Sequence, residues 1–261
     1  MVVTLPQSNN SAVKQSNARF IELDLLRGLA IIAMVFLHLI WDLDYFGLVP
    51  LDTNIYQLQP VVPALFFLLV GMCLVVSKNK KRHQTLQEER KYHQHLALRG
   101  LKIFSLGMII TTISLLVMPG KPVVFGVLHC IGLSIVLSIP FLKFRSYNLL
   151  FATLMILAGF VIGSYPVESP TAIHLAVGLH QSNVWAYTVD YFPLLPWFGA
   201  ALLGIALGDV LYKDNKRRFK MPDLSKYTPM RLFSWLGKHS LAIYLLHQPI
   251  IAGVLSVYLI L

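Results

Sequence analysis

Long apolar blocks alternate with short polar segments along most of the chain, and several blocks hold about 18 or more residues without a charge. A block of that length crosses the hydrocarbon core of a bilayer as an α-helix. A short amphipathic helix is also expected near 229–237. The pattern predicts an all-α, polytopic transmembrane bundle with seven spans, at 20–41, 60–77, 97–118, 124–142, 147–165, 191–211 and 238–261.

The N-terminal segment differs from the rest of the chain. Residues 1–18 are rich in Ser, Asn and Gln and are predicted to form a disordered cytoplasmic tail. The first apolar block opens with charged residues and has no small-residue cleavage site after it, so it is expected to be a span and not a signal peptide. Residues 19–261 are expected to form a single transmembrane domain.

Composition agrees with a membrane protein, because 56% of the residues are hydrophobic and only 13% are charged, against roughly 25% charged in a soluble domain. The formal net charge is +10. Its basic residues lie in short stretches between apolar blocks, without an Arg-rich soluble face, so a nucleic-acid partner is not expected. Cys73 and Cys130 both fall inside apolar blocks, and no disulfide framework is expected.

The basic residues also predict the orientation of the bundle. With the N-terminus in the cytoplasm, 21 of the 22 Lys and Arg residues fall on the inner side, and only Lys121 falls outside. This distribution follows the positive-inside rule. The C-terminus is therefore expected outside, in a multi-pass protein of the cytoplasmic (inner) membrane whose first partner is the lipid bilayer.

Ionisable residues within membrane helices are functional candidates, because burying them costs a few kcal/mol. In the first span, Arg27 and His38 lie within about 20° of one helix face and about 16 Å apart along the axis. Asp24 and Asp42 lie on the same face, so a polar stripe is predicted from the inner to the outer boundary. Alternatively, Asp24 and Arg27 form an ion pair at the inner interface, His38 is a neutral bundle residue, and Trp41 belongs to an aromatic belt.

The last span carries a second polar stripe, in which Ser240, Tyr244 and His247 follow helical spacing and Gln248 is adjacent. Pro249 cannot donate to the preceding turn, so the helix is expected to kink beside these side chains. The alternative for His247 is a structural hydrogen bond between helices.

Further candidates lie near the two ends of other spans. His129 and Asp190 are expected near the outer boundary, where Asp190 is alternatively the N-cap of the sixth span. Four basic side chains lie near the inner boundary: Arg99, Lys102, Arg231 and Lys238. They either reflect only the orientation of the spans or form a cytoplasmic pocket for a phosphorylated ligand. No histidine pair has convincing metal spacing.

Four stretches of the chain together resemble the short bacterial members of the heparan-α-glucosaminide N-acetyltransferase catalytic-domain family. The Arg-x10-His spacing of Arg27 and His38 is also similar to a motif of bacterial transmembrane O-acyltransferases. The four stretches are 23–32 (LDLLRGLAII), 126–132 (GVLHCIG), 190–199 (DYFPLLPWFG) and 236–250 (LGKHSLAIYLLHQPI).

The resemblance implies an enzyme that transfers an acetyl group from cytoplasmic acetyl-CoA to an amine or hydroxyl of an extracytoplasmic sugar or glycan. It places Arg27 at the donor and His38 at the transfer centre. We expect His38 to act as general base, Asp42 to fix its tautomer, and His129, His247 or Gln248 to stabilise the oxyanion. Expected donor contacts are Arg27, Asp24, Arg99, Lys102, Arg231 and Lys238; expected acceptor contacts are Trp41, Asp190, Trp197 and Tyr244. No metal is expected.

Two other functions stay open at the level of sequence. A transporter or permease also places Asp, Arg and His along a solute or ion path. A non-catalytic scaffold uses buried polar groups only to hold its helices together. The sequence also leaves open whether the protein forms a homo-oligomer.

Overall fold

The computed structural model describes residues 20–50, 57, 59–80, 85–214 and 216–260; the tail predicted at 1–18 lies outside these residues. The described chain is built from helices, with one short β-hairpin and three 3₁₀ turns, at Arg145–Tyr147, Val184–Ala186 and Leu224–Lys226. The helices are α1 (Ile21–Tyr45), α3 (Val61–Lys80), α4 (Leu86–Val117), α5 (Val127–Phe141), α6 (Asn148–Gly163), α7 (Ala172–Val177), α8 (Leu194–Leu211), α9 (Thr228–Lys238) and α10 (Ser240–Ile260). The hairpin pairs β1 (Tyr212–Lys213) with β2 (Lys216–Arg217).

Each of the seven predicted spans corresponds to a helix, which confirms the polytopic helical bundle. Six helices are long and apolar enough to cross a membrane, and α5 is a shorter apolar helix of 15 residues. The largest difference is the start of α4, which was predicted at residue 97 and begins at Leu86. The side chain of Thr85 accepts a hydrogen bond from the Glu88 N–H and caps a charged extension that apolar length could not reveal.

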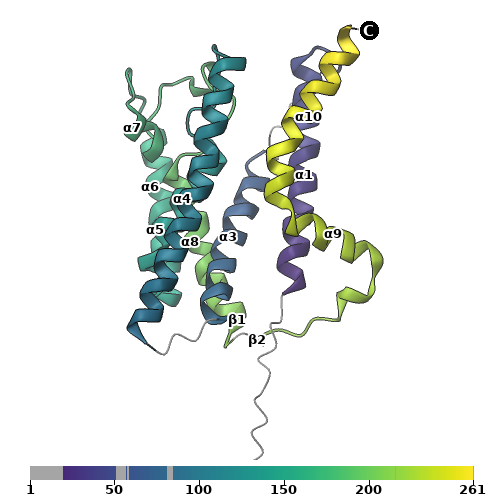
Figure 1. Ribbon diagram of the computed structural model, residues 1–261. Coiled ribbons are helices and arrows are strands. Elements are labelled where there is room, and N and C mark those ends of the chain that lie inside the picture. The colour runs from purple at the N-terminus through teal and green to yellow at the C-terminus, as the bar shows by residue number, and fades with distance from the viewer. Residues whose placement is uncertain (1–19, 51–56, 58, 81–84, 215, 261) are drawn as a thin grey trace, which may run out of the picture.

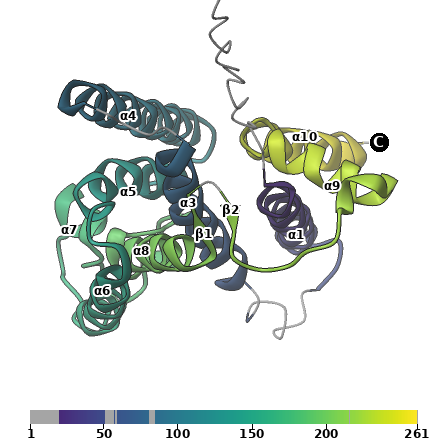
Figure 2. The ribbon, with the colours of Figure 1, turned by 90° about the horizontal axis from the view of Figure 1, so that it is seen from below.

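The helices form two groups that meet along α1 and α3 (Figures 1 and 2). In one group α8 packs between α3 and α6, and α4 packs against α5; in the other, α1 contacts both α9 and α10. Large apolar side chains remain exposed on outward faces, among them Leu116 (80%), Phe160 (68%) and Val254 (63%). Such faces suit contact with lipid tails.

The end of the bundle that carries β1, β2 and the start of α1 lies opposite the end that carries α7 and the C-terminus (Figure 1). We refer to these as the basic end and the outer end, following the predicted distribution of charge. The assignment of the basic end to the cytoplasm, and of residues 19–261 to a single domain, stays a prediction.

Glycines allow the helices of each group to approach closely. A Cβ atom at Gly204 of α8 would overlap the backbone of Leu68 on α3, and one at Gly71 of α3 would overlap Ala201 on α8. Gly28 of α1 lies equally close to the backbone of Phe233 on α9. Small residues at such crossings let the helices pack closely, and this van der Waals packing stabilises helix association in lipid, where the hydrophobic effect contributes little.

A polar clasp joins the start of α1 to the hairpin that follows α8. Two nitrogens of Arg217 each donate to a carboxylate oxygen of Glu22 at 2.7 Å, and the Tyr212 hydroxyl donates to the same carboxylate at 3.1 Å. The guanidinium also lies 5.4 Å from the ring centre of Phe20. Bidentate Arg–carboxylate pairs fix orientation as well as distance. The clasp therefore links the two helix groups at the basic end.

Candidate functional site

Two histidines from the first and last helices meet in the outer half of the bundle. The ring centres of His38 on α1 and His247 on α10 are 4.8 Å apart, with the rings at 89°. The Nδ1 atom of His38 lies 2.9 Å from the Met34 carbonyl oxygen, and that of His247 lies 2.6 Å from the Tyr244 carbonyl oxygen. A carbonyl only accepts, so each Nδ1 carries a hydrogen, and each neutral ring keeps its lone pair on Nε2.

One turn beyond His38, a second polar contact joins the same two helices. The amide nitrogen of Gln248 donates to both oxygens of Asp42, at 2.8 and 3.0 Å. We call this contact the Asp42–Gln248 bridge. It differs from the expected hydrogen bond between Asp42 and His38, because the Met34 carbonyl orients the His38 ring instead. The helix α10 continues through Pro249 to Ile260, so His247 and Gln248 lie on one continuous helix.

Two atoms of this cluster are buried without a hydrogen-bond partner among the described residues. They are the Nε2 atom of His247 and the Oε1 atom of Gln248. The His247 residue is only 8% exposed. Buried polar atoms are nearly always paired in native proteins, with protein, water or a ligand. Each of these two atoms can therefore accept a hydrogen bond that the described residues do not supply.

Asp190 approaches the histidine pair from the loop before α8. Its Oδ2 atom accepts a hydrogen bond from the Val127 N–H at 3.3 Å, at the first residue of α5. The alternative that Asp190 caps the sixth span is wrong, because the N-cap of α8 is Pro193 and Asp190 serves the start of α5. The Thr188 hydroxyl donates to the backbone carbonyl of Asp190 at 3.1 Å and holds this turn in place.

Burial raises the pKa of the Asp190 carboxyl to about 6, although the Val127 N–H and the nearby His38 ring oppose the rise. The folded state therefore binds a proton that an unfolded Asp releases near pH 4. The contribution of Asp190 to the free energy of unfolding is largest below about pH 4 and falls as the pH rises towards 6.

We expect this pH dependence to disappear in Asp190→Asn, which keeps an oxygen for the Val127 N–H but cannot ionise. Relative to this variant, the wild type should lose up to about 3 kcal/mol of stability between pH 4 and pH 7. Melting temperatures of the two purified proteins across this range measure the difference. Parallel melting curves at every pH would show that Asp190 does not titrate in this window.

His129 makes its contacts with residues of α4 and of the segment that leads into α5. It is 2% exposed, and its ring packs against Phe104 and Phe125, with ring centres at 5.2 and 5.5 Å. The Gly126 N–H donates to its Nδ1 atom at 3.2 Å, and the Thr111 hydroxyl lies 3.5 Å from its Nε2 atom. Both ring nitrogens thus have partners, one on α4 and one at the N-cap of α5.

Of the three aromatic residues expected to contact the acceptor, one lies beside the histidine pair and two pack against other side chains. Tyr244 lies beside the pair, with its ring centre 5.7 Å from that of His247. Trp41 stacks on Tyr45 further along α1, at 5.2 Å. Trp197 packs in the apolar core against Phe67 and Phe192. Only Tyr244 among these three contacts the cluster directly.

At the basic end, Arg27 ties three helices together. Its Nη2 atom lies 3.0 Å from the Asp24 carboxylate, and its Nη1 atom donates to the Gly237 carbonyl on α9 at 3.3 Å. Nη2 also lies 3.5 Å from the sulfur of Cys73 on α3. The ion pair considered as an alternative is therefore formed, and it lies inside the bundle between α1, α3 and α9.

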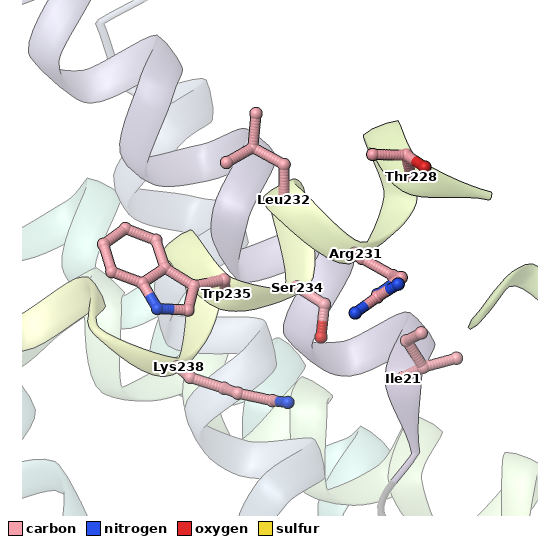
Figure 3. Close-up of a pocket in the computed structure, with 7 residues that line it drawn as sticks. All are labelled: Ile21, Thr228, Arg231, Leu232, Ser234, Trp235 and Lys238. Atoms are coloured by element: carbon pink, nitrogen blue, oxygen red, sulfur yellow. The ribbon is translucent and has the colours of Figure 1, made fainter. Parts of the chain in front are cut away.

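A pocket of about 590 Å³ opens between α9 and the start of α1 (Figure 3). Arg231 and Lys238 project to the same side of α9, with the Ser234 hydroxyl between them (Figure 3). Two cations around one pocket suit a phosphorylated ligand. The remaining lining residues are Ile21, Thr228, Leu232 and Trp235.

The other two expected donor contacts are elsewhere. Arg99 and Lys102 are exposed on α4, on the far side of the bundle from α9 (Figures 1 and 2). The six expected donor contacts thus fall into three places. Across the described ranges, no group of three His, Cys, Asp or Glu side chains is arranged to hold a metal ion.

Sequence reasoning missed some contacts of the site. The Met34 and Tyr244 carbonyls that orient the histidines are backbone groups and leave no trace in residue type. Thr188 and Cys73 are uncharged and sit in segments without a distinctive pattern. The one sequence signal for Thr188 is that it is a polar residue two positions before Asp190.

Comparison with known proteins relates this geometry to one family. No curated protein and no solved structure matches the chain. The model of the family described as heparan-alpha-glucosaminide N-acetyltransferase, catalytic, matches residues 19–249. This range contains both histidines of the pair, the Asp42–Gln248 bridge, Arg27 and the α9 pocket. The predicted resemblance is confirmed: the chain belongs to the heparan-alpha-glucosaminide N-acetyltransferase catalytic-domain family and is a membrane acyltransferase.

Proposed function

We propose that the protein transfers an acetyl group from acetyl-CoA at the basic end to an amine or hydroxyl of a sugar or glycan at the outer end. The observation that carries this proposal is the His38–His247 pair, whose Nδ1 atoms are held by backbone carbonyls so that the Nε2 atoms stay available. An imidazole oriented in this way is suited to act as a general base.

The reaction needs one proton acceptor and one leaving group. The acceptor amine or hydroxyl gives its proton to Nε2 of His38 as its nitrogen or oxygen attacks the thioester carbonyl carbon. The new C–N or C–O bond forms, the C–S bond breaks, and the thiolate of CoA leaves. The proton taken up by His38 then passes to the thiolate, so His38 returns to its neutral state.

The donor is expected to span most of the first helix. Ile21, at the α9 pocket, lies 17 residues before His38, which corresponds to about 25 Å along α1. The nucleotide phosphates would lie at Arg231 and Lys238, while the extended pantetheine arm passes Arg27, which Asp24 holds in place. Arg99 and Lys102 lie outside this path. Under the positive-inside rule the donor enters from the cytoplasm.

Proteoliposomes with the purified protein test the proposal directly. Radiolabelled acetyl-CoA is supplied on the side of the basic end, and methyl α-glucosaminide, an amino sugar, is supplied on the other side. Labelled acetyl sugar should appear on the acceptor side without transfer of CoA. Uptake of the sugar in the absence of acetyl-CoA would instead identify a permease.

The α9 pocket gives a separate prediction for the donor. We expect the double variant Arg231→Ala/Lys238→Ala to raise KM for acetyl-CoA about tenfold or more, because charge-assisted hydrogen bonds to phosphate contribute about 1.5–3 kcal/mol. KM for the acceptor should stay within twofold. Steady-state kinetics in the same proteoliposomes measure both constants.

The matched control is Arg218→Ala/Lys220→Ala, which removes two exposed cations from the same end of the molecule. This control should leave KM for acetyl-CoA unchanged. Equal effects of the two double variants would mean that net charge at the basic end matters and the pocket does not.

A further inference from the structure

We propose that His247 and Gln248 hold the acceptor substrate by accepting hydrogen bonds from its nucleophilic group. The inference rests on the proposed function and names the chemistry that the acceptor must present, which is two hydrogen-bond donors on neighbouring positions. A primary amine or two adjacent hydroxyls meet this requirement. The roles expected for these residues in stabilising the oxyanion would then fall to other groups.

A backbone carbonyl of α10 determines which ring nitrogen of His247 donates a hydrogen bond and which one accepts. The Tyr244 carbonyl oxygen lies 2.6 Å from Nδ1 and can only accept, so Nδ1 carries the hydrogen. In the neutral ring Nε2 is therefore an acceptor. This atom is buried without a hydrogen-bond partner among the described residues, and the residue as a whole is 8% exposed.

The Asp42–Gln248 bridge determines how the amide nitrogen and oxygen of Gln248 are oriented. Both oxygens of Asp42 lie within 3.0 Å of one amide atom of Gln248, and a carboxylate only accepts. That atom must be the nitrogen, so the Oε1 oxygen points away from Asp42. Oε1 is likewise buried and unpaired within the described part of the chain. Adjacent residues of α10 thus present two unpaired acceptors.

The neighbouring imidazole and carboxyl groups add further acceptors. Nε2 of His38 is an acceptor by the same argument as His247, and the Asp190 carboxyl lies close enough to the His38 ring for the two groups to interact. A thioester carbonyl oxygen has only lone pairs and would find no donor among these atoms. An amine or a pair of hydroxyls supplies the hydrogens that the buried acceptors lack.

The test separates acceptor binding from donor binding. In proteoliposomes with acetyl-CoA and methyl α-glucosaminide, His247→Phe should raise KM for the amino sugar about tenfold, the value of one lost hydrogen bond. KM for acetyl-CoA should stay within twofold. His247→Gln, which keeps an acceptor atom at the end of its side chain, should recover most of the affinity. A fall in kcat with an unchanged acceptor KM would overturn the proposal in favour of the oxyanion role.

Gln248 is tested by the double variant Asp42→Leu/Gln248→Met, which removes both partners of the bridge and leaves no buried charge unpaired. It should raise the acceptor KM by a similar factor. The amine and the diol arms are distinguished by inhibition with the N,N-dimethyl derivative and with the parent methyl α-glucoside. An equal rise in KM for acetyl-CoA would indicate a structural role only and would overturn the proposal.

A binding measurement keeps this inference distinct from the proposed function. In protein labelled with ¹⁵N-histidine, the Nε2 signal of His247 is assigned by its loss in His247→Gln. It should shift when methyl α-glucosaminide is added without acetyl-CoA, and shift less with the N,N-dimethyl derivative. A shift without acetyl transfer would contradict the proposed function alone, and an unchanged signal would contradict the inference.

Discussion

Replacement of His38 by Ala should reduce acetyl transfer by about 10²- to 10⁴-fold, the range that a positioned general base contributes. The ring is half-buried, and its Nδ1 atom is fixed by the Met34 carbonyl, so its Nε2 atom is the group lost. Transfer of label from acetyl-CoA in proteoliposomes measures the effect. KM for acetyl-CoA should change little, because the α9 pocket is far along α1 from this residue.

A matched control for His38→Ala is His95→Ala, which removes an exposed imidazole from α4 and should leave transfer unchanged. Thermal unfolding of all three proteins separates the enzyme from a scaffold. A scaffold would lose folding and activity together in His38→Ala. Full transfer by a folded His38→Ala protein would remove this residue from the mechanism.

Replacement of Gly204 by Leu should have the largest effect on folding. Even a Cβ atom at this position would overlap the Leu68 backbone, so the side chain would force α8 away from α3. Overpacking of a tight core costs about 1–3 kcal/mol or more, and this contact holds the larger helix group together. We expect little folded protein after purification, as measured by size-exclusion chromatography and thermal unfolding in detergent.

Gly253→Ala provides the control, because a Cβ atom at this position of α10 would have no neighbour within 4 Å. Alanine also favours helix over glycine by about 1 kcal/mol. Gly253→Ala should therefore be as stable as the wild type or slightly more stable. Normal folding of Gly204→Leu would mean that α3 and α8 can separate without loss of the bundle.

The sequence predicted the spans well because their signal is local. An apolar run such as 60–77 reports directly on α3, and the strongly amphipathic segment 229–237 reports on α9. The hairpin β1–β2 and the short helix α7 were not predicted, since each has only a few residues. The start of α4 was predicted too late because its first eleven residues are helical without being apolar.

The site was predicted as two faces and not as a set of contacts. Helical spacing placed His38 and Asp42 on one face of α1, and the structure keeps them there. Spacing alone favoured a hydrogen bond between these two residues. In the structure, the amide of Gln248, which is far away in the chain, donates to the Asp42 carboxylate instead. The rotation of α10 against α1 depends on packing over the whole bundle, which one-dimensional periodicity does not contain.

The Asp42–Gln248 bridge joins positions that are 206 residues apart. Its two halves come from the first and the last helix, and the histidine pair is divided in the same way. During biosynthesis, the two imidazole rings therefore cannot meet until α10 has been synthesised and has entered the bilayer. If these rings act as proposed, the nascent chain is expected to be inactive and unable to acylate another nucleophile before assembly is complete.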